Sequence, residues 1–221
     1  MHHHDQGLTE LKDKLVSMAG HAETAVHRAI QAFVERNDAL AVRTRQDDAI
    51  LDRLEMEIDD LAIQLLAKAP LASDLRLITI AMKISRDLER VGDEGTTIAR
   101  RAIELNQEPP LKPYIDLPHM AQIALDMLRE ALDAFVARDP SRARRVIPRD
   151  KQVDALNKQL HRELASYMVE TPATITRCLN LMVISKSLER IADHATNIAE
   201  EVVYLYEGRD IRHTGKQGAL S

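Results

Sequence analysis

The residues that could do chemistry are carboxylates in pairs four positions apart, with two such pairs in each half of the chain. The eight acids are Asp48, Asp52, Glu89, Asp93, Asp150, Asp154, Glu189 and Asp193. Residues at i and i+4 share one face of a helix, where two like charges repel by roughly 0.2–0.5 kcal/mol. Carboxylate oxygens are the donors that hard and borderline cations take. The pairs therefore predict one metal site per half, provided that neighbouring helices bring their pairs together.

A long motif that carries two of these pairs occurs twice. Residues 84–99 and 184–199 both read I-S-x-x-L-E-R-x-x-D-x-x-T-x-I-A, at an offset of 100 residues. In both segments apolar residues recur every three or four positions, which predicts a helix with one face buried against other helices. Residues 32–37 also match residues 134–139, at an offset of 102. The chain is therefore predicted to contain one helical unit in two copies.

The composition favours an all-α fold. Aromatic side chains are limited to two phenylalanines and four tyrosines, and the chain contains only seven glycines. Strands joined by tight turns need more glycine than this. The core is therefore expected to be aliphatic, as it is in helix bundles.

Each half is expected to form three amphipathic helices, which gives two tandem three-helix bundles of up-down-up topology. The predicted units are a first bundle at 8–105, a proline-rich linker at 106–118, a second bundle at 119–207 and a flexible tail at 208–221. We expect Asp38 to cap the second helix and Ser73 or Asp74 to cap the third. Pro148, which has no counterpart in the first half, is expected to kink or delay the fifth helix.

Charge and hydropathy exclude several classes of partner. The net charge of −5 and the pI near 6.0 give no reason to expect nucleic acid or insertion into an anionic membrane. No apolar run approaches the ~20 residues that span a bilayer, and no secretion signal is evident. The single cysteine, Cys178, suits a reducing compartment, so the cytoplasm is expected. His2–His4 could be a tag remnant or a native start.

Two alternatives to a metal-binding regulator remain open at this stage. Arg90 and Arg190 could neutralise the acids themselves, which would leave a plain helical scaffold without metal. The acids could also serve a metal-dependent enzyme. Against an enzyme, the sequence contains no Glu-x-x-His di-iron motif, no phosphate-binding glycine loop and no nucleophile elbow.

Taken together, these motifs resemble the PhoU family of phosphate-uptake regulators over nearly the whole chain. The resemblance is carried by the two tandem repeats, by I-S-x-x-L-E-R-x-x-D in both halves, and by three further segments at 69–76, 197–202 and 204–208. It implies a cytoplasmic, usually dimeric, non-enzymatic adaptor that keeps the phosphate-starvation response off when phosphate is plentiful. It also implies contacts with the ATPase subunit of the phosphate transporter and with a sensor histidine kinase.

The resemblance further implies metal binding. Members of the family hold clusters of transition metals, such as iron, zinc or nickel, through paired E/D-x-x-x-D motifs that match the eight acids above. This chain departs from the pattern, because Ala69 stands where an arginine is common and Asn157 replaces the acid equivalent to Glu55. Pro148 also disturbs the approach to Asp150. The second metal site is therefore expected to be weaker than the first.

Overall fold

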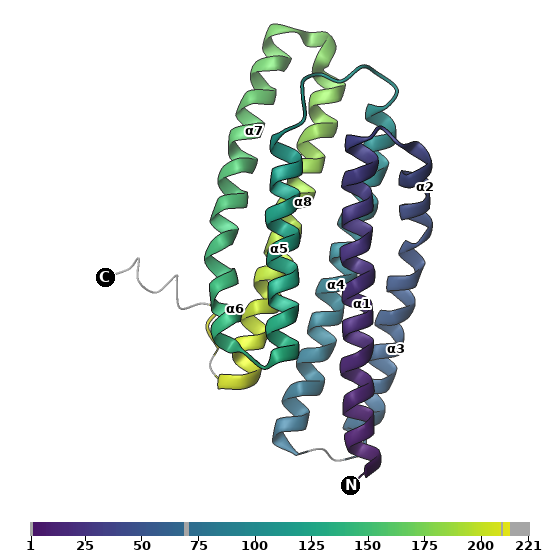
Figure 1. Cartoon of the computed structure of the whole chain (residues 1–221), viewed down its shortest axis with the longest axis vertical. Coiled ribbons are helices and arrows are strands. Elements are labelled where there is room, and N and C mark those ends of the chain that lie inside the picture. Colours follow the sequence, from purple (N-terminus) through teal and green to yellow (C-terminus); the bar gives the residue numbers. More distant parts are fainter. Residues whose placement is uncertain (1, 69–70, 209, 213–221) are drawn as a thin grey trace, which may run out of the picture.

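The first half of the chain forms an up-down-up bundle whose middle helix is broken (Figure 1). The computed structural model describes residues 2–68, 71–208 and 210–212. The helices of this half are α1 (His2–Val34), α2 (Asp38–Gln46), α3 (Asp48–Leu66) and α4 (Ala72–Leu105). The side chains of residues 2–4, and residues 69 and 70 altogether, lie outside the description, so the expectations about the N-terminal histidines and Ala69 do too.

The second half repeats this arrangement. Its elements are α5 (Asp116–Ala137), α6 (Pro140–Val146), the 3-10 turn η1 (Ile147–Arg149), α7 (Asp150–Glu170), the 3-10 turn η2 (Pro172–Thr174) and α8 (Ile175–Glu207). Figure 1 shows that α5, α7 and α8 form one bundle, with α6 at its lower end. The prediction of an all-α fold with two tandem three-helix bundles is confirmed, and the described residues contain no strand.

Local chemistry explains where the middle helix of each half begins. Asn37, and not Asp38 as predicted, caps α2, because its side chain accepts a hydrogen bond from the Leu40 amide. Asp139 caps α6 in the same way, through the Arg142 amide at 3.0 Å. The predicted disturbance at Pro148 is present as the 3-10 turn η1, since proline lacks the amide hydrogen that an α-helix needs.

Other helix ends differ from the predictions. The prediction that Ser73 or Asp74 caps the third helix is wrong, because α4 already begins at Ala72. Helix α5 begins at Asp116, inside the stretch expected to be a linker. After Gly208, whose positive φ of 69° ends α8, the Arg212 guanidinium lies 3.4 Å from Glu201. The expected flexible tail is therefore anchored at this point, and residues 213–221 lie outside the description.

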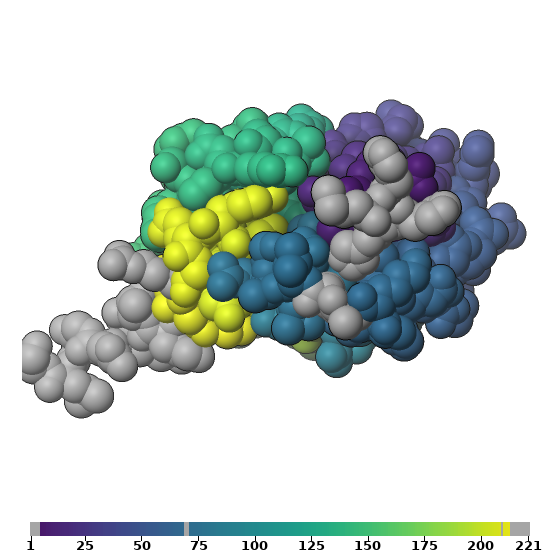
Figure 2. Space-filling view, turned by 90° about the horizontal axis from the view of Figure 1, so that it is seen from below, coloured from purple at the N-terminus to yellow at the C-terminus, as the bar shows by residue number. Residues whose placement is uncertain are grey.

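The two halves share one hydrophobic core. Helix α4 packs along α8 and α1 packs along α5, so one cluster of buried aliphatic side chains runs through both bundles. Seen from the lower end in Figure 2, the start of α4 lies beside the end of α8, which makes these two helices antiparallel. The Arg76 guanidinium stacks 5.7 Å from the centre of the Tyr204 ring at this contact. Among the described residues, no helix is both long and apolar enough to cross a membrane.

Candidate functional site

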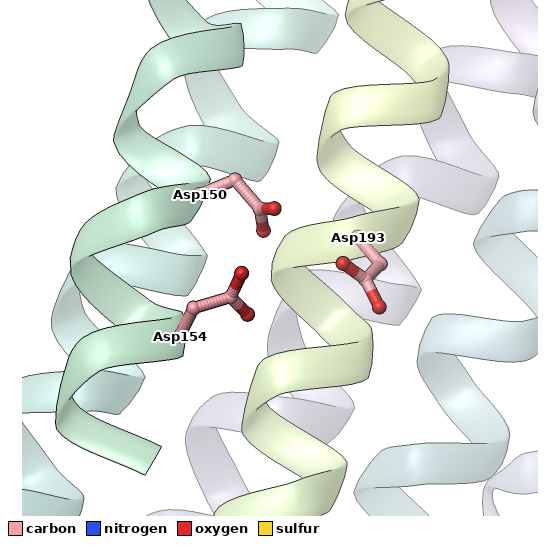
Figure 3. Close-up of side chains that lie close together, drawn as sticks. All are labelled: Asp150, Asp154 and Asp193. Atoms are coloured by element: carbon pink, nitrogen blue, oxygen red, sulfur yellow. The ribbon is translucent and has the colours of Figure 1, made fainter. Parts of the chain in front are cut away.

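Three aspartates meet between α7 and α8. Asp150 and Asp154 project from α7 toward α8, which carries Asp193 (Figure 3). One carboxylate oxygen from each residue lies within 4.8 Å of those of the other two. Oxygens that bind one cation at 2.0–2.6 Å lie at most about 5 Å apart, so this spacing fits a shared ion.

The helix register places these acids at the edge of a buried seam. On α7 the buried residues are Val153, Leu160 and Leu164, so Asp154 follows a seam position directly. Asp150 is the first residue of α7, immediately after the turn that Pro148 imposes. The acids are consequently held by the packing of their helices and not by a flexible loop.

Burial and mutual repulsion shift the protonation of this cluster. Partial burial, the charge of Glu189 and the charge of Asp150 raise the pKa of Asp193 to about 7. Burial, with Asp154 and Glu189 nearby, raises the pKa of Asp150 to about 6. One buried oxygen of Asp150 also lacks a hydrogen-bond partner within the described part of the chain. An oxygen-rich site with an unsatisfied oxygen and crowded negative charge suits a divalent cation.

Glu189, the fourth acid predicted for this half, lies beside the cluster but outside the group of three. It acts electrostatically on Asp150 and Asp193, while the Lys186 ammonium lies 2.5 Å from its Oε2 atom. The exposed lysine is a partner that a cation could displace, because exposed ion pairs contribute little stability. Glu189 thus acts on the charge of the aspartates without joining their group of three.

The acids of the first half do not converge on one point in the described structure as those of the second half do. Burial chiefly raises the pKa of Asp48, the nearby Thr96 hydroxyl lowers it, and the charges of Asp93 and Asp52 raise it. Asp48, Asp52 and Asp93 therefore face one another. No three oxygens of this half meet the spacing seen between α7 and α8, as far as the described residues show.

Glu89 lies near both Asp93 and Glu55. Burial, then Asp93, raises its pKa to about 7, and Glu55 adds to the effect. Glu55 was not among the predicted ligands, although it continues the acidic face of α3 one turn beyond Asp52. A cavity of about 490 Å³ opens at this point, with Glu55, Asp59 and Glu89 in its wall.

Arg90 contacts the acids of the first half, as the scaffold alternative requires. Its Nε atom lies 3.6 Å from Glu89 and its Nη1 atom 3.3 Å from Asp93. The equivalent prediction for Arg190 is wrong, because Arg190 reaches Glu94 on α4 at 3.4 Å. The tighter cluster of acids thus lies in the second half, where no arginine contacts the three aspartates among the described residues.

Sequence reasoning missed a polar contact between the halves. His194, which follows the predicted ligand Asp193, has its Nδ1 atom 2.8 Å from Asp87 on α4. The Asn197 amide donates to the same carboxylate at 3.3 Å. No local pattern could have revealed this contact, because its partners are more than a hundred residues apart.

The fold and the site define a class of protein: an all-helical chain made of a duplicated up-down-up bundle, with acid pairs on the second and third helices of each copy. Comparison with known families matches the PhoU domain twice, over residues 15–102 and 117–202. The chain belongs to the PhoU family.

Known relatives and solved structures match nearly the whole chain. The phosphate-specific transport system accessory protein PhoU homolog of Pseudomonas putida is 42% identical over 94% of this chain and 82% of its own length. The homolog of Aquifex aeolicus is 41% identical, over 93% and 94% respectively. The crystal structure of PhoU from Pseudomonas aeruginosa superposes with a TM-score of 0.90 at 40% identity, covering 93% of this chain and 99% of that one. The Streptococcus pneumoniae PhoU structure gives 0.88 at 27% identity, covering 94% and 99%.

Proposed function

We propose that this protein is a cytoplasmic, non-enzymatic regulator that acts as an accessory to phosphate-specific transport. The observation that carries the proposal is the match to accessory proteins of that transport system over 94% of the chain, with both halves included. Its expected action is to keep the phosphate-starvation response off when phosphate is plentiful. Its expected partners are the ATPase subunit of the phosphate transporter, a sensor histidine kinase and a second copy of itself.

The regulatory role is tested by deletion and partner capture. A strain that lacks the protein is expected to express a phosphate-starvation reporter in high phosphate, and the wild-type chain should restore repression. Affinity capture with the chain as bait is expected to recover the transporter ATPase and the kinase. A reporter that stays repressed in the deletion strain would count against the role, and failure to recover either partner would count against this mode of action.

The acid pairs are proposed to bind transition-metal ions, with iron, zinc and nickel as candidates. Asp150, Asp154 and Asp193, with Glu189 beside them, are the ligands proposed for the second half. For the first half they are Asp48, Asp52, Glu89 and Asp93. A bound cation would neutralise the repulsion between these carboxylates and would link the helices that carry them.

The two halves are expected to differ in affinity. In the first half a cation must displace Arg90 from Glu89 and Asp93, whereas no arginine contacts the three aspartates of the second half in the described structure. We therefore expect the second half to fill first. The ion pairs of Arg90 are also the observation that favours the metal-free scaffold alternative for the first half.

Metal analysis tests this proposal most directly. The chain should be prepared without its N-terminal histidines, because neighbouring histidines bind transition metals by themselves. Addition of Zn²⁺ followed by desalting and elemental analysis is expected to leave bound metal, and Asp193→Asn is expected to remove the tighter-bound fraction. The matched control is Asp60→Asn, since Asp60 is exposed on α3 and lies outside the proposed ligands. Equal metal content in wild type and Asp193→Asn would contradict the site.

A further inference from the structure

A polar cavity of about 430 Å³ lies between α4 and α8, where the two halves of the molecule meet. Four cationic side chains line it, namely Lys83, Arg86, Arg90 and Arg212, together with the carboxylates of Asp87, Glu200 and Glu201. Small-molecule sites commonly have volumes of about 300–1,000 Å³, so the cavity can admit a small ligand.

The carboxylates of this cavity already have partners. Asp87 accepts a hydrogen bond from Asn197 and contacts His194. Glu201, whose side chain is only 8% exposed, lies 3.2 Å from the Lys83 ammonium and 3.4 Å from the Arg212 guanidinium. Arg212 also binds Asp210 through its Nε and Nη2 atoms, so the charges of Lys83 and Arg212 are both balanced by carboxylates.

Among the cations that line the cavity, Arg86 is available to bind a ligand. Its side chain is exposed into the cavity, and within the described residues it forms no hydrogen bond or ion pair, although it acts at longer range on Glu55. The side chain of Lys83 remains 45% exposed, so its ammonium can also reach a ligand. A guanidinium with free donors in a partly enclosed cavity favours bidentate binding of an oxyanion.

We propose that the cavity between α4 and α8 binds an oxyanion of the phosphate class, with Arg86 as the principal contact and Lys83 as a supporting cation. The anion is either free phosphate or the phosphate group of a small ester, because the chemistry of recognition is the same and the cavity has room for both. The choice of phosphate rests on the proposed role in phosphate uptake, whereas the oxyanion site rests on the cavity and on the Arg86 guanidinium that lines it. The site is separate from the three aspartates between α7 and α8.

The test is calorimetric titration of the metal-free full chain, at low salt, with inorganic phosphate and with adenosine monophosphate in parallel. Arg86→Gln is expected to weaken binding roughly 10- to 100-fold, which is the loss of one charge-assisted hydrogen-bonding group. The matched control is Lys186→Gln, because Lys186 occupies the position 100 residues later, is 46% exposed and does not line the cavity. Thermal unfolding of both variants checks that each is folded.

The two ligands distinguish the sources of the anion. Tighter binding of inorganic phosphate identifies the free ion, and tighter binding of the monophosphate identifies an ester; both support the site when Arg86→Gln reduces them and Lys186→Gln does not. Absence of binding by both ligands, or equal binding to wild type and Arg86→Gln, would overturn it. The deletion-strain reporter is read separately, so a chain that represses the reporter without binding either ligand would refute this site and leave the regulatory role intact.

Discussion

Asp193 is a carboxylic acid held near its protonation midpoint at neutral pH. Burial and the neighbouring acids raise its pKa from 3.8 to about 7 in the folded chain. In the unfolded chain the same group loses its proton near the ordinary value, so the folded state binds more protons between these two pH values. Stability of the metal-free protein must therefore fall as pH rises through this window. Asp150, with a folded pKa of about 6, contributes with the same sign.

Metal-free protein is accordingly expected to unfold at a higher temperature at about pH 5.5 than at about pH 8. Asp193→Asn is expected to raise the midpoint at the higher pH, because the amide carries no charge to repel Asp150 and Glu189, and to reduce the difference between the two conditions. Thermal unfolding followed by circular dichroism in a chelating buffer measures this. A wild-type midpoint that is higher at the alkaline pH would contradict the charge crowding, and Asp60→Asn serves as control for the loss of one surface charge.

Metal binding should reverse this trend. A cation binds the deprotonated carboxylates and must displace protons from Asp193 and Asp150, so affinity is expected to rise between about pH 5.5 and pH 8. Titration with Zn²⁺ in two buffers of different ionisation enthalpy would detect the released protons. Zinc binding that releases no protons at about pH 6 would show that these acids are not the ligands.

At the level of the helices, Gly95 fixes how closely α4 approaches α1. A Cβ atom at this position would lie 3.3 Å from backbone atoms of Ala25 and Val26, and a backbone cannot move aside as a side chain can. The second half has Ala195 at the position 100 residues later. The two copies therefore share a motif but differ in whether a Cβ atom occupies this position.

Gly95→Ala is expected to destabilise the protein by about 1–3 kcal/mol, because overpacking between α1 and α4 outweighs the gain in helix propensity. Gly20→Ala is the matched control. Gly20 also lies inside a helix, but a Cβ atom there meets nothing within 4 Å, so this variant should gain about 0.5–1 kcal/mol. Chemical denaturation provides both values. A neutral or stabilising effect of Gly95→Ala would mean that α1 and α4 can separate without loss.

For the whole molecule, the shared core joins the two copies into one folding unit. Leu88, Ile98 and Ala99 of α4 and Leu188, Ile198 and Ala199 of α8 are all fully buried members of the same cluster. Contacts such as that of His194 with Asp87 then bridge the halves at the surface. Separation of the copies would expose the apolar sides of α4 and α8 to water.

The chain is therefore expected to unfold in one cooperative transition, although its sequence contains two repeats. Differential scanning calorimetry should give a single peak whose calorimetric and van't Hoff enthalpies agree. The fragment 8–105 by itself should be less stable and prone to associate, because it lacks the helices that cover α4. Two resolved transitions, or an isolated fragment as stable as the full chain, would show that the copies fold independently.

The sequence by itself determined the helices, the duplication and the acids that could matter. Apolar spacing of three and four residues fixes which face of a helix is buried, and i, i+4 pairs fix which acids share a face, because both depend on the geometry of one helix alone. Asp150, Asp154 and Asp193 were accordingly identified before any coordinates. The capping error at Asp38 arose because the neighbouring Asn37 offers a competing cap, whereas α4 begins after Leu71 without any side-chain cap.

Only the tertiary structure decided which acids meet and what neutralises them. The rotation and axial shift of one helix against another depend on the packing of many seam side chains at once, and no local spacing records them. For this reason the sequence could not show that Arg190 reaches Glu94 while Arg90 stays with Glu89 and Asp93. Two copies of one motif thereby acquire different electrostatic environments, and the tighter cluster of acids lies in the half that the sequence ranked second.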